Sequence, residues 1–240
     1  MSTPSAVWHW LTTASHYQGS DGVPHRLAEH AGISFEAIII AAAITVPLGV
    51  VLGHVRRFGI IVTVIANASR AIPVIGVLIL LSVGPLGVGR NSAIVALIIF
   101  AVPPILTNTY TGVRQVDNDI REAAVGMGMN ARQVITRVEV PLALPLIAAG
   151  FRLAAIQVWA TATLAAIVGS GGLGQFIVVG FGTQDYGQLY GGVVYVALTA
   201  VVLEAGFAAI ERWLRRRLGQ SRPVTLAEPT EPAAQTVVTA

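Results

Sequence analysis

One polar stretch between two apolar runs determines how this chain is organised: residues 113–141 read VRQVDNDIREAAVGMGMNARQVITRVEVP. The pattern predicts two short helices. Asp119 is the expected N-cap of the first, with Glu122 three residues later in a capping-box position. Gly126 and Gly128 then predict a turn, because glycine tolerates backbone conformations that other residues resist.

Each of the two predicted helices has an apolar face. In the first, small or apolar side chains recur at helical spacing: Ile120, Ala123, Ala124 and Met127. In the second, the apolar positions are Ala131, Val134, Ile135 and Val138. Pro141 is expected to end this helix. An ordinary solvated loop is the alternative, and it is disfavoured because such loops rarely contain two amphipathic helices.

The spacing within this stretch resembles the EAA loop of ABC-importer permeases. That motif reads Glu-Ala-Ala, three residues, Gly, nine residues, then an apolar-x-apolar-Pro ending. Here Glu122, Ala123, Ala124, Gly128 and residues 138–141 fill those positions, with Val138 and Val140 where Ile and Leu are usual. The resemblance implies a cytoplasmic coupling loop whose short helix docks on a partner ATPase. The implied coupling residues are Glu122, Ala123, Ala124, Gly128 and Pro141.

The composition is that of an integral membrane protein. Of its 240 residues, 54% are hydrophobic and 11% are charged, and the mean hydropathy is +0.71. A soluble domain carries about 25% charged residues. The chain has no cysteine, and its five histidines lack a tight ligand spacing, so we expect no metal site and no cofactor. The arginines flank apolar spans, which indicates membrane topology rather than nucleic-acid binding.

The hydropathy pattern predicts an all-α protein with five transmembrane helices, each able to cross a ~30 Å hydrocarbon core. The predicted spans cover residues 34–54, 58–83, 91–112, 143–168 and 190–210. Residues 1–33 are expected to form an external N-terminal segment, and 34–218 the transmembrane permease domain. The remaining residues, 219–240, are rich in Pro, Thr, Ala and Glu, which predicts a disordered cytoplasmic tail.

The distribution of arginines predicts the orientation of these spans. In a five-span arrangement one side holds Arg56, Arg57, Arg114, Arg121, Arg132, Arg137, Arg212, Arg215, Arg216 and Arg217. The other side holds only Arg26 and Arg90. The N-terminus is therefore expected outside, with the 113–141 loop and the C-terminus in the cytoplasm of a bacterial cell. This reasoning does not use the family, and it places the coupling loop where an ATPase can reach it.

A glycine-rich segment lies between the last two predicted spans. Residues 169–176 read GSGGLGQF and match G-x-G-x-x-G formally, but they follow a membrane helix, so they are not a dinucleotide-binding loop. The glycines instead favour tight re-entrant backbone at the outer mouth. Five-span importer permeases have a similar Gly-Gly-Leu-Gly segment near their external gate. The implied gate residues are Gly169, Gly171, Gly172, Leu173 and Gly174; a plain flexible loop is the alternative.

No catalytic constellation and no ATP-binding loop is visible in the sequence, so a transport subunit powered by a partner ATPase is expected rather than an enzyme. The resemblance is greatest to osmoprotectant permeases, which carry glycine betaine, carnitine, choline or proline betaine. The residues behind it are 68–73, 145–152 and 160–166. It implies three kinds of partner: ATP-binding subunits, a second permease subunit and an external binding protein. The alternative substrates are methionine, a phosphonate or a sulfonate. The alternative protein classes are a stand-alone carrier or channel and a membrane-embedded enzyme.

Three charged residues fall inside the predicted spans: Arg70, Arg152 and Glu204. An unpaired charge at the centre of a membrane helix costs at least ~2.5 kcal/mol. Arg152 and Glu204 lie at similar depths from the cytoplasmic end, about 5 Å apart at ~1.5 Å per helical residue. We therefore expect Glu204 to pair with Arg152, with Arg70 as the alternative partner. Separate contacts of each charge with headgroups or backbone carbonyls would be the other arrangement.

Overall fold

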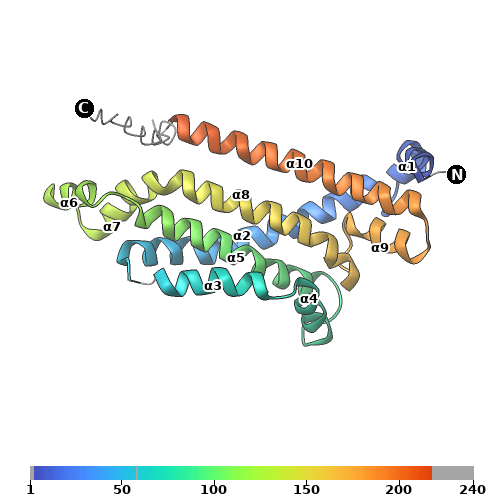
Figure 1. The fold of residues 1–240 in the computed structure, drawn as a ribbon, viewed down its shortest axis with the longest axis horizontal. Helices are drawn as coiled ribbons and strands as arrows, with labels where there is room; N and C mark the ends of the chain where they lie inside the picture. Colours follow the sequence, from blue (N-terminus) through green and yellow to red (C-terminus); the bar gives the residue numbers. More distant parts are fainter. Residues whose placement is uncertain (1–2, 58, 218–240) are drawn as a thin grey trace, which may run out of the picture.

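The computed structural model describes residues 3–57 and 59–217, and every regular element in these ranges is helical (Figure 1). Four long helices run side by side along the long axis of the molecule: α2 (Val23–Val55), α5 (Arg90–Arg114), α8 (Val140–Ala165) and α10 (Tyr186–Arg217). At one end lie α1 (Thr3–Thr12) and α9 (Gly174–Gly182), and at the other α6 (Asn118–Gly126) and α7 (Ala131–Val134). The predicted tail, 219–240, lies outside the described residues.

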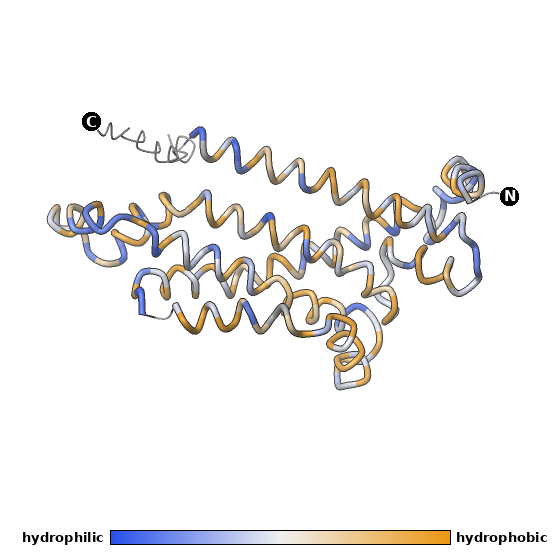
Figure 2. The backbone as a smooth tube through the Cα atoms, viewed as in Figure 1, coloured by the Kyte–Doolittle hydropathy of each residue, from blue (hydrophilic) through white to orange (hydrophobic). Residues whose placement is uncertain are grey.

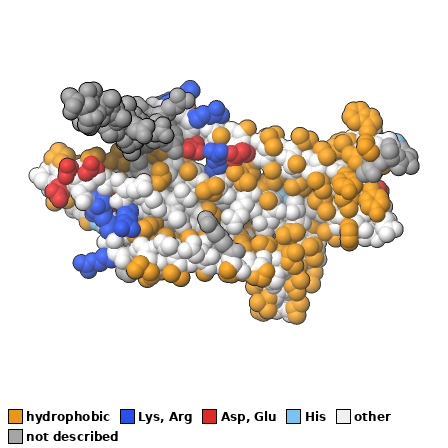
Figure 3. Space-filling model, viewed as in Figure 1, with side chains coloured by type: hydrophobic (Ala, Val, Ile, Leu, Met, Phe, Trp, Pro, Cys, Tyr) orange, Lys and Arg blue, Asp and Glu red, His pale blue; other side chains and the backbone are white. Residues whose placement is uncertain are grey.

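Within the described residues, four helical segments are long and apolar enough to cross a membrane. They are Val23–Val55, Arg90–Arg114, Ala131–Val168 and Tyr186–Leu214. Hydrophobic residues dominate these segments, whereas hydrophilic ones gather mainly around α6 and α7 and at the C-terminal end of α10 (Figure 2). Apolar side chains also cover much of the visible surface (Figure 3), as suits a surface that faces lipid. The all-helical prediction is confirmed for the described residues.

The prediction of one continuous helix over residues 58–83 was wrong. The chain forms α3 (Gly59–Ala71) and α4 (Val74–Val83), with a break at Ile72 and Pro73. Proline has no backbone N–H to donate and disfavours helical backbone in the residue before it. The run is mostly apolar, with Asn67 and Arg70 inside it, but neither helix alone is long enough to span the hydrocarbon core.

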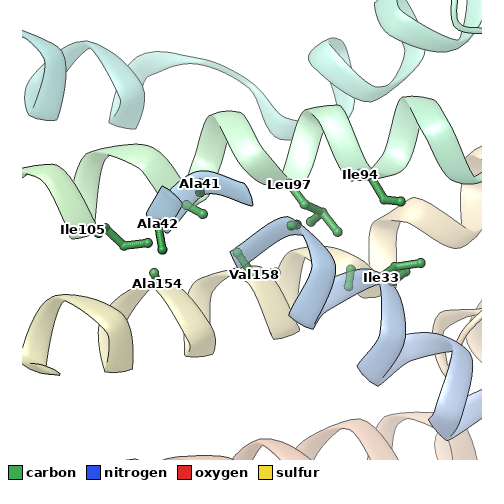
Figure 4. Packing of buried hydrophobic residues seen from close by; sticks show 11 residues of the cluster. Ile33, Ala41, Ala42, Ile94, Leu97, Ile105, Ala154 and Val158 are labelled. Carbon is green, nitrogen blue, oxygen red and sulfur yellow. The ribbon is translucent and has the colours of Figure 1, made fainter. Parts of the chain in front are cut away.

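The core is built where α2, α5 and α8 pack together (Figure 4). Its buried residues are mainly alanines and branched aliphatic residues: Ile33, Ala37, Ala41, Ala42, Ile94, Leu97, Ala101, Ile105, Ala154, Val158 and Ala162. Small residues let helix backbones approach closely, which is how membrane helices gain packing energy. A Cβ atom on Gly53 would lie 2.7 Å from Val113 Cβ, and one on Gly150 would lie 2.7 Å from Asn108 Cβ.

Helix α2 begins at Val23, eleven residues before the first predicted span. The polar residues His25, Arg26 and Glu29 hid this start from the hydropathy pattern. Trp10 of α1 is buried against Phe176 of α9, with ring centroids 5.3 Å apart. Much of the predicted external segment 1–33 is therefore helical and packed against the membrane helices rather than separate from them.

The prediction that Pro141 ends the second loop helix was also wrong. A π-helical turn, η2 (Ile135–Glu139), joins α7 directly to α8, and Pro141 lies in the first turn of α8. Proline cannot donate a backbone hydrogen bond, and the π turn that precedes it already departs from the i→i−4 pattern that proline would interrupt. The segment from Ala131 to Val168 is consequently one long helical rod.

Candidate functional site

The loop between α5 and α8 contains the candidate coupling residues. The first of its two helices is capped by Asp117, whose Oδ1 accepts from the Asp119 N–H at 2.9 Å, so the prediction of Asp119 as the cap was wrong. The capping box occurs instead at α7, where Asn130 and Gln133 exchange side chain–backbone hydrogen bonds of 2.9 and 3.0 Å. Both helices thus begin at caps that fix where the chain turns.

Gly128 forms the turn after α6. Its φ is +84°, the Met129 N–H donates to Ala124 O at 3.2 Å, and the Gly128 N–H donates to Val125 O at 2.9 Å. This is a Schellman motif, in which glycine provides the left-handed residue beyond the helix. Gly126, the other glycine of the predicted turn, lies inside α6. Gly128 alone therefore sets the angle between α6 and α7.

Helix α6 presents an apolar face that nothing within the described chain covers. Ile120 and Met127, seven residues apart and therefore on one side of the helix, are 46% and 72% exposed, whereas Ala124 is buried. Val125, which is 60% exposed, lies on another side. Glu122 and Ala123 are also exposed. Beside Glu122 lies a cavity of about 640 Å³ between α6, α7 and the end of α2. An uncovered apolar face at the tip of the molecule, flanked by a carboxylate, is a surface suited to a protein partner.

The two glycines of this turn form a matched pair for testing it. A Cβ atom at either Gly126 or Gly128 would meet no atom within 4 Å, but only Gly128 has positive φ. Gly128→Val therefore introduces strain of about 1–2 kcal/mol without a clash, and Gly126→Val does not. We expect Gly128→Val to reduce stimulation of the partner ATPase by loaded binding protein, and Gly126→Val to retain it. Equal stimulation in both variants would contradict a coupling role for the turn.

A buried carboxylate beneath α6 ties three elements together. The Glu139 side chain is fully buried, its Oε1 lies 2.7 Å from Arg121 Nε, and its Oε2 lies 2.8 Å from His54 Nδ1. Arg121 comes from α6, His54 from the end of α2, and Glu139 from the π turn. A buried charge is stable only when paired, so this cluster, which we call the Glu139 cluster, locks the loop to the membrane helices.

Sequence reasoning missed the Glu139 cluster. It assigned no role to Glu139 or to His54. The available signal was an acid between Val138 and Val140, inside an otherwise apolar approach to a membrane helix. Such an acid requires a partner, but the partner is 85 residues away for His54, and a single sequence does not reveal so distant a pairing.

The glycine segment forms a tight loop followed by a short helix at the opposite end of the molecule. Gly169, Gly171 and Gly172 have φ of +74°, +77° and +78°. Leu173 is fully buried in a cluster with Trp10, Val23, Trp159 and Phe176. Gly174 begins α9, and its backbone is pressed against the Thr163 carbonyl so closely that no side chain would fit. The loop is thus an ordered structure, which disfavours the plain flexible connector.

Two residues of α2 hold this loop in place. Glu29 Oε2 accepts from the Gly172 N–H at 2.9 Å and also from Arg26 Nη1 at 2.9 Å. Arg26 in turn donates to Asp21 at 2.5 Å. The fully buried His30 lies under Gly172 and contacts the Trp159 carbonyl oxygen at 3.0 Å. The five predicted gate residues are therefore brought together, and their anchor, which the sequence did not indicate, lies on α2.

The predicted contact between Arg152 and Glu204 is present. Arg152 of α8 forms an ion pair with Glu204 of α10, and its Nη1 donates to Glu211 at 3.1 Å. Glu211 lies two turns beyond Glu204 on the same face of α10 and was not predicted as a partner. The side chain of Arg70 is outside the described part of the structure. One guanidinium thus serves two carboxylates between α8 and α10.

This three-residue cluster gives a test by charge removal. With Glu211 still in place, Glu204→Gln is expected to reduce the folded yield only partly, because Arg152 keeps one carboxylate. The double variant Glu204→Gln with Glu211→Gln should lose more than the sum of the single losses. Folded yield is measured by size-exclusion chromatography of a fluorescent fusion. Strictly additive losses would show that the two carboxylates act separately.

A family model described as "binding-protein-dependent transport system inner membrane component" matches residues 45–220. The chain belongs to this family. The match includes the whole α6–α7 loop, the Glu139 cluster and the glycine segment. The chain is thus an inner-membrane permease component of an ABC importer, and the identification made from the EAA spacing is confirmed.

Relatives of this permease align with more than three quarters of its length. It is 38% identical to the choline transport system permease protein OpuBB of Bacillus subtilis, over 79% of this chain and 87% of the relative. It is 37% identical to the glycine betaine/carnitine/choline transport system permease protein OpuCB of the same organism, over 78% and 86%. The carnitine transport permease protein OpuCB of Listeria monocytogenes is 38% identical, over 76% and 84%.

A solved structure shares the fold of this permease. An inward-facing conformation of the MetNI methionine ABC transporter superposes with a TM-score of 0.67 and 25% sequence identity, covering 78% of this chain and 93% of that one. The methionine-importer-like permease fold is therefore confirmed.

Proposed function

We propose that this permease carries quaternary-amine osmoprotectants, such as glycine betaine, carnitine, choline or proline betaine, into the cell. The observation that carries the proposal is 37–38% identity over most of the chain to permeases named for choline and for glycine betaine/carnitine/choline transport. The polar loop with its uncovered α6 face is the second support, because an importer without an ATP-binding loop of its own needs an ATPase to dock there.

We propose a five-span arrangement in which α3 and α4 cross the membrane together. Helix α3, with thirteen residues, covers about 20 Å at ~1.5 Å per residue. The break at Ile72 and Pro73 and the helix α4, which turns away from the line of α3 (Figure 1), complete the crossing. The N-terminus is then outside, and α6, α7 and the C-terminal end of α10 are cytoplasmic. The arginine bias supports this orientation. The glycine segment, at the far end from α6, then lies at the outer mouth and forms the external gate.

The proposal requires three kinds of partner. Cytoplasmic ATP-binding subunits dock on α6 and hydrolyse ATP. A second permease subunit, identical or paralogous, completes the pathway. An external binding protein selects the solute, because the aromatic side chains in the middle of the helix bundle are buried: Phe100 is 2% exposed and Trp159 is 7% exposed. A quaternary ammonium needs free aromatic faces for cation–π attraction, so the binding protein supplies them.

Substrate competition tests this proposal. Vesicles containing the assembled importer take up radiolabelled choline, and unlabelled glycine betaine, carnitine, methionine, a phosphonate or a sulfonate is added in excess. We expect competition from the quaternary amines alone. Absence of choline uptake by vesicles that do take up labelled methionine, the phosphonate or the sulfonate would replace the proposed substrate class while leaving the importer assignment intact.

A further inference from the structure

A second polar pocket, unrelated to the coupling face of α6, opens between the start of α3 and the last turns of α5. Its volume is about 530 Å³. The lining residues come from the end of α2, from α3 and from α5: Arg56, Arg57, Gly59, Ile60, Val62, Thr63, Val64, Thr107, Tyr110, Thr111 and Arg114. We refer to it as the α3–α5 pocket.

One wall of the α3–α5 pocket is strongly basic. Arg56, Arg57 and Arg114 line it, and no acidic residue is among its described lining residues. Arg56 also holds the backbone, donating to the Val116 carbonyl at 2.5 Å. Arg57 and Arg114 are exposed, and no carboxylate within the described chain forms an ion pair with either. Two arginines without a protein counter-charge favour a bound anion.

Gly59 gives this wall its shape. A Cβ atom at Gly59 would lie 2.8 Å from Arg114 Nη1 and 2.9 Å from the Tyr110 hydroxyl. Glycine at the start of α3 therefore lets the guanidinium and the phenol approach the α3 backbone. Arg114 Nη1 donates to the Tyr110 hydroxyl at 3.1 Å and lies over its ring. The guanidinium is thus held facing the pocket before any ligand arrives.

The other wall of the pocket combines a polar group with apolar side chains. The Thr107 hydroxyl oxygen is buried with no hydrogen-bond partner among the described residues. The apolar side chains of Ile60 and Val64 on α3, which are 82% and 58% exposed, also line the pocket. A ligand that fills the pocket therefore needs an anionic, hydrogen-bonding head and an apolar part that leaves along α3.

We propose that the α3–α5 pocket binds the phosphate headgroup of an anionic phospholipid, with the acyl chains along α3. Free phosphate shares the head chemistry but leaves the apolar wall uncovered, and a lipid satisfies both walls. The location agrees, since α2 ends and α3 begins here, where a chain turns at the membrane surface. The inference rests on the proposed orientation only for assigning the site to the cytoplasmic leaflet, whose anionic lipids attract basic side chains.

Native mass spectrometry of the intact chain in detergent tests the site without any transport assay. Phosphatidylglycerol and phosphatidylcholine are titrated separately onto the wild type, Arg57→Gln, Arg114→Gln and the double variant. We expect tighter binding of phosphatidylglycerol by the wild type. Each single variant should weaken the first binding step about fivefold, and the double variant roughly 25-fold, since one arginine near an anionic surface contributes about 1 kcal/mol.

Controls separate a specific site from general attraction between charges. Arg216→Gln removes an exposed arginine from the same end of the molecule, outside the pocket, and is expected to bind like the wild type. Arg57→Lys keeps the charge and should retain most of the affinity. Equal affinities across all variants overturn the proposal, as does equal binding of the two lipids. Saturating inorganic phosphate that displaces the lipid completely would make the pocket a free-anion site and also overturn it.

Discussion

Glu139→Gln is expected to lower the free energy of unfolding by about 3–5 kcal/mol, a larger change than for any exposed residue of the loop. The substitution keeps the size of the side chain but removes the charge that both Arg121 and His54 contact. A guanidinium next to a neutral, buried amide loses its counter-charge, and the contact joining α2, α6 and the π turn is weakened. Unfolding in detergent, followed by circular dichroism, measures the loss.

Glu122 provides the matched control for Glu139. Both are glutamates of the same loop, but Glu122 is exposed and Glu139 is fully buried. Glu122→Gln should change the free energy of unfolding by no more than about 0.5 kcal/mol while still affecting assembly or coupling. The double variant Glu139→Gln with Arg121→Gln should lose less than the sum of the single losses. Equal, small effects of Glu139→Gln and Glu122→Gln would refute the role of the Glu139 cluster.

Gly171→Val and Gly172→Val are expected to abolish uptake while the protein still reaches the membrane in normal amounts. Positive φ alone costs a non-glycine residue about 1–2 kcal/mol. A Cβ atom would in addition lie 2.6 Å from Glu29 Oε2 at Gly171 and 3.1 Å from His30 Nδ1 at Gly172. Both changes displace the loop from its anchor on α2. Uptake into vesicles, normalised to membrane abundance, is the measurement.

Gly19 separates backbone strain from loss of the loop anchor. Its φ of +75° is nearly that of Gly171, but a Cβ atom there would meet nothing within 4 Å. Gly19→Val should therefore suffer similar strain and still support uptake. Wild-type uptake by both Gly171→Val and Gly172→Val would show that the loop is only a connector. Loss of uptake in all three variants would attribute the defect to backbone strain in general.

The sequence predicted most of the membrane helices because hydropathy over twenty residues is a strong local signal. It failed where one residue overrides that signal. Pro73 breaks an apolar run that composition alone presents as a single span. Pro141 had the opposite outcome, because its position in the first turn of α8, after a π turn, removes the usual cost of proline in a helix. Whether a proline breaks a helix depends on its position within that helix, which local composition does not reveal.

The candidate site was predictable to the extent that it is local. The Glu122–Gly128 spacing located the coupling helix, and matching depth in two spans correctly paired Arg152 with Glu204. Two contacts of α2 were not found: Glu139 with His54, and Glu29 with Gly172. Each joins a residue of α2 to a segment far along the chain, and only the packing of the helices brings them together.

ATP dependence of uptake most directly tests whether this chain works as the permease of an ABC importer. Vesicles are prepared with the chain alone, with the chain and its partner ATPase, and with the ATPase and the Gly128→Val variant, each supplied with loaded binding protein. We predict uptake only when the ATPase and ATP are both present, and a marked reduction in the Gly128→Val vesicles. Uptake by the chain alone, driven by an ion gradient and unaffected by ATP, would contradict the account.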